Sequence, residues 1–139
     1  VENVATGDGG ALFLRSTTES KVVRCVFERN RAQRGGGALD IGHSTHVLVD
    51  RSVFHGNTAQ VGGGVFLNGT GAIELRSCTF VDNRAEHPRG GTALFVQGAA
   101  SNGPSAYISS SVFAGADAVA GDSATKFTVY FAHSIVPPE

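Results

Sequence analysis

A column of four asparagines at nearly equal spacing constrains the fold of this chain more than any other feature of its sequence. The asparagines follow one another after 27, 27 and 26 residues, at Asn3, Asn30, Asn57 and Asn83. A phenylalanine stands three residues before three of them, at Phe27, Phe54 and Phe80. Repetition at such a period is typical of a solenoid, in which each repeat buries its core face against the next repeat.

Other residue types keep the same period. Paired glycines follow each asparagine, at Gly9-Gly10, Gly36-Gly37, Gly63-Gly64 and Gly90-Gly91. The regular repeats span residues 1–96, whereas residues 97–139 lack both motifs. We expect residues 97–139 to form degenerate C-terminal coils of the same single domain, 1–139. Because the chain starts inside a repeat, at Val1, and contains no methionine, we also expect it to be a segment of a longer protein.

The repeat unit predicts strands and turns. It offers three short β-prone runs, which in the second full unit are residues 38–41, 46–49 and 52–54, with turn residues between them. No segment keeps a helical period over ten or more residues, which excludes the helical solenoids. Three strands per coil, with coils about 4.8 Å apart, make a parallel β-helix. The sequence therefore predicts an all-β, right-handed parallel β-helix of about five coils, about 24 Å long.

Alternation along the strands predicts which side chains fill the interior. We expect one wall to carry Val47, Val49, Ile73, Leu75, Ala106 and Ile108, and a second wall to carry the phenylalanine column. These two sets are out of step by one residue, which predicts a corner at Val23-Arg24, Asp50-Arg51 and Arg76-Ser77. The third wall is predicted to hold Leu12, Leu39, Phe66 and Leu94.

The combination of Phe-x-x-Asn with Gly-Gly-Ala resembles the repeat of chlamydial polymorphic membrane proteins. The first motif occurs at residues 27–30, 54–57 and 80–83, and the second at residues 9–11 and 36–38. In that family the repeats form passenger domains on the cell surface, and some of them are adhesins. The resemblance implies a right-handed β-helix at the cell surface or outside the cell, and it implies no catalytic residues.

The most regular polar columns are predicted to be structural. Stacked amides can hydrogen-bond to one another and to the turn backbone, so the asparagines are expected to form a buried ladder. A second column precedes each phenylalanine by two residues, at Cys25, Ser52 and Cys78. Its cysteines lie two coils apart, about 9.6 Å by stacking, which exceeds the reach of a disulfide. We expect two buried free thiols in a ladder shared with serine.

Candidate catalytic residues are few. Several β-helix proteins are polysaccharide lyases, epimerases or hydrolases, which gather carboxylates with basic residues on one wall for calcium binding or acid–base chemistry. The nearest approach here is Asp40 with His43. An isolated Asp-x-x-His is typical of solvated turn residues, so the sequence assigns no catalytic site and keeps these two as weak candidates.

Two candidate binding surfaces remain. One is an outward stripe on the first strand of each coil, predicted to be exposed, with large apolar side chains at Phe13, Leu67 and Phe95 and with Asp40 between them. The other is an arginine cluster in the first coils, which includes Arg31 and Arg34 and which could hold sulfated or uronic-acid glycans. The simpler alternatives are a C-terminal segment folded over the stripe and charges that serve solubility.

Net charge, hydropathy and cysteine spacing argue against several further classes of function. The net charge of −1 argues against a nucleic-acid partner, and no apolar run approaches the roughly 20 residues of a membrane helix. Two cysteines without close spacing give no metal signal, and no cofactor is expected. The sequence favours a non-enzymatic extracellular or cell-surface module that serves assembly or adhesion, with a protein or a host glycan as partner. The alternative is a polysaccharide-active enzyme domain.

Overall fold

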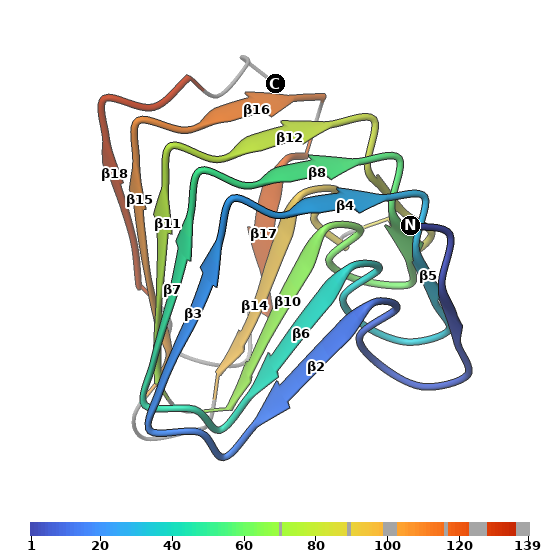
Figure 1. Ribbon diagram of the computed structural model, residues 1–139, viewed down its shortest axis with the longest axis horizontal. Coiled ribbons are helices and arrows are strands. Elements are labelled where there is room, and N and C mark those ends of the chain that lie inside the picture. The colour runs from blue at the N-terminus through green and yellow to red at the C-terminus, as the bar shows by residue number, and fades with distance from the viewer. Residues whose placement is uncertain (70, 89, 99–102, 116, 123–127, 136–139) are drawn as a thin grey trace.

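The computed structural model describes residues 1–139 except 70, 89, 99–102, 116, 123–127 and 136–139. The described residues form eighteen β-strands and no α-helix, and the strands stack into four parallel sheets that enclose one core (Figure 1). Four complete turns of four strands are followed by two strands of a fifth turn. The structure therefore confirms the right-handed parallel β-helix, with an incomplete fifth coil.

The four sheets contain strands from successive coils in order. Sheet A consists of β1 (Val4–Ala5), β5 (Arg31–Ala32), β9 (Thr58–Ala59) and β13 (Arg84–Ala85). Sheet B consists of β2 (Leu12–Arg15), β6 (Leu39–Gly42), β10 (Val65–Gly69), β14 (Leu94–Gly98) and β17 (Val119–Gly121). Sheet C consists of β3 (Glu19–Val23), β7 (His46–Asp50), β11 (Ala72–Arg76), β15 (Ser105–Ser109) and β18 (Thr128–Ala132). Sheet D consists of β4 (Val26–Glu28), β8 (Val53–His55), β12 (Thr79–Val81) and β16 (Val112–Ala114).

The coil has one strand more than the sequence predicted. Sheet A was missed because each of its strands is only two residues long and directly follows the asparagine. So short a segment shows no alternation that could separate it from a turn. The three predicted runs correspond to sheets B, C and D, with boundaries shifted by one residue.

A left-handed backbone residue turns the chain from sheet C to sheet D in every complete coil. The residues at this corner are Arg24 (φ 54°), Arg51 (φ 49°), Ser77 (φ 52°) and Ser110 (φ 49°). A single residue in this conformation reverses the sense of alternation, so the inward side chains of sheets C and D are offset by one residue. This confirms the predicted corner.

Stacked phenylalanines line the interior wall of sheet D. Phe27, Phe54, Phe80 and Phe113 are parallel neighbours with ring centroids 4.8, 4.6 and 4.8 Å apart. Opposite them, the predicted inward residues of sheet C are fully buried, among them Val47, Ile73 and Ile108. Each coil thus repeats the side-chain positions of the coil before it, and the core is a set of continuous columns.

The prediction for the third wall was wrong in one coil. Val65, and not Phe66, pairs with Leu39 and Leu94 in the inward column of sheet B. Phe66 instead lies in the outward column, and Leu67 is a core residue with 1% of its surface exposed. Gly35 of the second coil pairs with Val61 of the third, so the third coil is one residue shorter in the turn after sheet A. The deletion could not be located from the sequence, because the three successive glycines at 62–64 can be aligned with Gly36-Gly37 in two ways.

Candidate functional site

The outer face of sheet B carries the most unusual set of side chains. Its first outward column contains Phe13, Asp40, Phe66 and Phe95, which are neighbours in the strand register. Its second outward column contains Arg15, Gly42, Asn68 and Gln97. Aromatic residues and one carboxylate thus lie beside a row of polar side chains.

A glycine-rich turn packs against this face. A Cβ atom at Gly35 would lie 2.2 Å from a ring carbon of Phe66, so only glycine allows the turn between β5 and β6 to rest on that ring. The predicted stripe is exposed only at Phe13, at 48%, whereas Asp40, Leu67 and Phe95 have 2%, 1% and 9% of their surface exposed. The prediction of an exposed apolar stripe was wrong.

A pocket of about 320 Å³ lies between the turns and this face of sheet B. Its walls combine one ion pair, three amide side chains and an apolar part that includes Val61 and Phe66. The lining residues are Asp8, Arg34, Gly35, Gln60, Val61, Phe66, Asn68 and Gln97. The volume is at the lower end of the range found for small-molecule sites.

Asp8 organises the mouth of this pocket. One of its carboxylate oxygens accepts a hydrogen bond from the backbone N–H of Gly35 at 2.9 Å, and the other accepts one from Arg34 Nη2 at 2.6 Å. Asp8 and Arg34 come from turns of adjacent coils, so the ion pair joins the two turns. The Arg34 guanidinium makes no other side-chain hydrogen bond among the described residues, and 73% of the side chain is exposed.

Asp40 is the buried carboxyl beside this pocket. Its pKa is raised to about 7, first by burial and then by the negative charge of Asp8, whereas Arg34 and Arg15 act to lower it. The structure gives the Asp40 carboxyl no hydrogen bond among the described residues. The expectation that Asp40 is a solvated turn residue was wrong, because it lies within β6 under the turn.

The two weak catalytic candidates are not brought together. His43 is exposed and left-handed (φ 49°) at the end of β6, where its ring lies against Gly69 of the next coil. No hydrogen bond or ion pair joins His43 to Asp40 among the described residues. Within the same part of the chain, no group of three or more histidine, cysteine or acidic side chains is placed to hold a metal ion.

The predicted binding residues fall on different surfaces. Arg34 lines the pocket, whereas Arg31 lies on sheet A and pairs with Glu86 two coils away, at 3.1 Å. Leu67 lies in the core, with 1% of its surface exposed, so its side chain is not accessible to a ligand. The residues that the sequence missed are Asp8, Gln60, Phe66, Asn68 and Gln97; correct alignment of the third coil would have placed Phe66 and Asn68 on the outward face.

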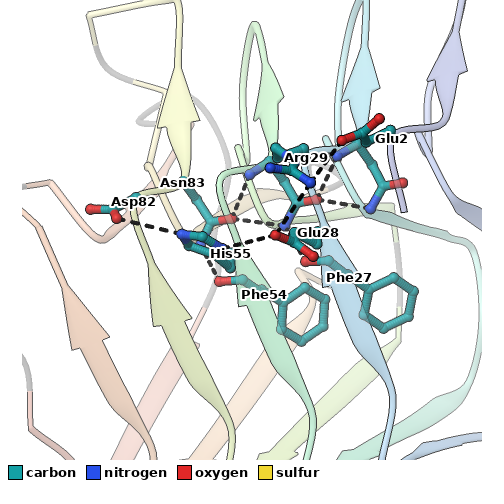
Figure 2. Close-up of polar contacts among 10 residues, drawn as sticks. Glu2, Phe27, Glu28, Arg29, Phe54, His55, Asp82 and Asn83 are labelled. Atoms are coloured by element: carbon teal, nitrogen blue, oxygen red, sulfur yellow. Dashed lines mark hydrogen bonds and ion pairs between the residues drawn. The ribbon is translucent and has the colours of Figure 1, made fainter.

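The asparagines form a continuous ladder of hydrogen bonds beside sheet D. Nδ2 of Asn3, Asn30 and Asn57 each donates to Oδ1 of the next asparagine at 2.9 Å, and the backbone N–H of each donates to the same oxygen at 3.0 Å. Figure 2 shows the end of this ladder at Asn83, whose Nδ2 also donates to the Phe54 carbonyl at 2.8 Å.

Ion pairs follow the same corner on the outside. Arg29 contacts Glu2 at 2.7 Å and Glu28 at 3.6 Å (Figure 2). His55 lies between Glu28 and Asp82, at 3.7 and 3.6 Å. These groups are largely exposed, so each pair contributes little to stability.

The cysteine and serine column also forms a ladder. Ser52 Oγ accepts from the backbone N–H of Cys25, and Ser111 Oγ accepts from that of Cys78, both at 3.1 Å. Both thiols are free. Cys78 is buried, and burial raises the pKa of its thiol, but Cys25 is only half-buried because it lies in the first coil. The expectation of two buried thiols was therefore wrong for Cys25.

A second hollow, of about 700 Å³, lies at the N-terminal end of the solenoid. Its lining combines side chains of the core, Leu12, Val22 and Phe27, with exposed residues such as Val23 and Val26. It is the open end of the core columns and gathers no set of polar groups. The pocket on sheet B is therefore the better candidate site.

Comparison with known proteins supports the fold and leaves the ligand open. A family model described as a right handed beta helix region matches residues 1–130. No curated protein matches the chain, and no solved structure matches it. The described residues include no helix that could cross a membrane. The resemblance to chlamydial polymorphic membrane proteins stays a prediction.

Proposed function

Because this chain belongs to the family of right-handed β-helix proteins, we propose that it is a non-enzymatic binding module whose ligand is an anionic saccharide held in the pocket on sheet B. The observation that carries the proposal is the pocket itself, which places an exposed guanidinium beside three amide side chains. Arginine binds carboxylate and sulfate groups through paired hydrogen bonds, and amides suit the hydroxyls of a sugar.

In this proposal Arg34 binds the anionic group of the sugar, and the amide side chains bind its hydroxyls. Arg34 has one donor committed to Asp8 and offers the others to the anionic group. Asn68 and Gln97, neighbours on adjacent strands, donate to and accept from hydroxyls. Gln60 is held in place by its hydrogen bond to Glu86, at 2.6 Å. Sheet B holds the backbone of Asn68 and Gln97 in place, which reduces the entropy lost when a ligand binds.

Calorimetric titration with uronic-acid, sulfated and neutral oligosaccharides tests the proposal. We expect binding of the anionic sugars, at least a tenfold loss of affinity in Arg34→Gln, and no comparable loss in Arg29→Gln. Arg29 is a matched control because it is an exposed, ion-paired arginine at another corner of the solenoid. Absence of binding to every anionic sugar, or equal losses in the two variants, would contradict the proposal.

A second candidate function is a polysaccharide-active enzyme, because the pKa of Asp40 lies near 7, as that of a general acid does. Release of reducing ends or unsaturated products from pectin, alginate, hyaluronan or chondroitin, lost in Asp40→Asn, would favour this function over the first.

The location of the module outside the cell or on its surface is part of the same proposal. It rests on the resemblance of the Phe-x-x-Asn and Gly-Gly-Ala repeats to passenger domains. Protease shaving of intact cells of the source organism would test it, since an intracellular module would survive the treatment.

A further inference from the structure

A second arginine stands at the N-terminal end of the polar row on sheet B. The row consists of Arg15, Gly42, Asn68 and Gln97, which are register neighbours on β2, β6, β10 and β14. Asn68 and Gln97 line the pocket, whereas Arg15 lies two strands before Asn68. With strands about 4.8 Å apart, the row is about 14 Å long, so it extends beyond the pocket toward the first coil.

The side chain of Arg15 leans along this row toward the pocket. Its Cγ atom lies 3.7 Å from the position that a Cβ atom of Gly42 would take. Side chains that stand straight out from neighbouring strands are separated by the strand spacing, about 4.8 Å, so the shorter distance shows that Arg15 crosses toward Gly42. Gly42 is buried although it stands in an outward column, as expected of a residue that a neighbouring side chain covers. The absence of a side chain at Gly42 therefore lets Arg15 point toward the amides of the pocket.

The Arg15 guanidinium has donors that the described part of the fold does not use. Arg15 is exposed, and among the described residues its side chain makes no hydrogen bond and no ion pair. Asp40 Oδ1 lies 3.8 Å from the same Cβ position of Gly42, but no ion pair joins it to Arg15 in this part of the chain. Arg34 is different, because one of its donors is bonded to Asp8. The row thus adds a second arginine to the one at the pocket mouth.

We propose that Arg15 is a second anion-binding group of the sheet B site, so that the site selects saccharides that carry at least two acidic groups. This inference rests on the proposed function, in which Arg34 binds one anionic group and the amides bind hydroxyls. A ligand whose two anions match the two arginines binds more tightly than a ligand with one anion, because the second contact costs little further translational freedom. An acidic oligosaccharide that lies along the solenoid axis presents its anionic groups in this way.

Titration with a uronic-acid monosaccharide and with its trisaccharide tests the second group. Calorimetry measures the trisaccharide, and NMR chemical shifts measure the weaker monosaccharide. We expect Arg15→Gln to lower the affinity for the trisaccharide on the order of tenfold and to leave that for the monosaccharide unchanged. Arg34→Gln should weaken both. Arg24→Gln is the control and should weaken neither, since Arg24 is an exposed arginine at the corner between sheets C and D.

Gly42 offers a second test, in which the arginine is kept. Its backbone has no left-handed φ, so a side chain is not strained there, but a leucine side chain would fill the space into which Arg15 leans. We expect Gly42→Leu to lose trisaccharide affinity as Arg15→Gln does. Gly42→Ala, whose methyl group meets only ordinary contacts, should retain it. Circular dichroism verifies that each variant keeps the β-sheet signal of the wild type.

Inorganic sulfate separates this inference from the proposed function. In an NMR titration, sulfate should shift the backbone amide of Gly42 in the wild type and in Arg34→Gln, but not in Arg15→Gln. A trisaccharide affinity that is equal in wild type and Arg15→Gln, or a Gly42 shift that persists in Arg15→Gln, overturns the second group and leaves the role of Arg34 intact. Sulfate binding at Arg15 without binding of any acidic saccharide supports the anion-binding group and rejects the proposed ligand.

Discussion

At the scale of single residues, buried polar side chains distinguish this solenoid from a purely apolar stack. Asn57 is fully buried and takes part in hydrogen bonds with Asn30, Asn83 and the Phe27 carbonyl. Asp40 is equally buried and has no such partners. Folding gives Asn57 hydrogen bonds, whereas burial disfavours the charged form of Asp40, so substitutions at the two positions should act in opposite directions.

Asn57→Ala should destabilise the protein by on the order of 1–3 kcal/mol. The substitution removes the acceptor of two Asn30 donors and the donor to Phe27, all of them away from water. Urea denaturation followed by circular dichroism measures the loss. Asn68→Ala, on the half-buried outer face, is the control and should shift the midpoint less. Equal midpoints for wild type and Asn57→Ala would show that the ladder is not a source of stability.

Asp40→Asn should stabilise the protein above neutral pH, by on the order of 2–4 kcal/mol. The folded pKa of about 7 lies above the unfolded value of 3.8, so the folded state holds a proton that the unfolded state has lost between these two pH values. Stability should therefore fall with rising pH across this window, by up to about 1.4 kcal/mol per unit, and level off above it. Denaturation at several pH values checks this. A wild-type stability that rises from pH 4 to pH 7, relative to the variant, would contradict it.

At the scale of elements, glycines decide how closely the coils approach at the turn before sheet B. A Cβ atom at Gly37 would lie 2.1 Å from the carbonyl oxygen of Gly63, and one at Gly10 would lie 2.0 Å from that of Gly37. Gly10, Gly37 and Gly63 form a column at which the main chains of successive coils are in direct contact. The turn that covers Asp40 and Phe66 can take its place only because this column has no side chains.

Gly37→Ala should destabilise the fold by about 2–3 kcal/mol, because the new methyl group meets backbone atoms that cannot move without separating the coils. Gly42→Ala, three residues into β6, is the matched control. Its new methyl group would meet only ordinary contacts, at 3.7 Å or more, so its stability should equal or slightly exceed that of wild type. Thermal unfolding of both variants measures the difference, and similar losses would refute this account of the column.

At the scale of the whole molecule, the repeat period of the sequence was enough to predict which residues form columns along the solenoid. The asparagine, phenylalanine and cysteine–serine columns were assigned correctly because each recurs at fixed spacing on one face. The exchange of Phe66 and Leu67 was not predictable, since three successive glycines permit two alignments. The pocket was missed for another reason. It depends on a turn that packs on the outer face of sheet B, and periodicity determines which residues face outward but not what covers them.

The direction of the hydrogen bonds between coils has a mechanical consequence. Every sheet is parallel, so these bonds join each coil to the next along the solenoid axis. A force that pulls the two ends of the solenoid apart passes through every interface between coils, but at a terminal coil it acts on the bonds of the end strand one after another, whereas between interior coils the strands of all the sheets share it. In an optical trap the protein should therefore lengthen stepwise, each step releasing one coil, which in the regular repeats has 26 or 27 residues, on the order of 90 Å of chain. The asparagine and phenylalanine columns would then act as the repeated barrier that spaces these steps, and rupture of all coils in a single event would contradict this behaviour.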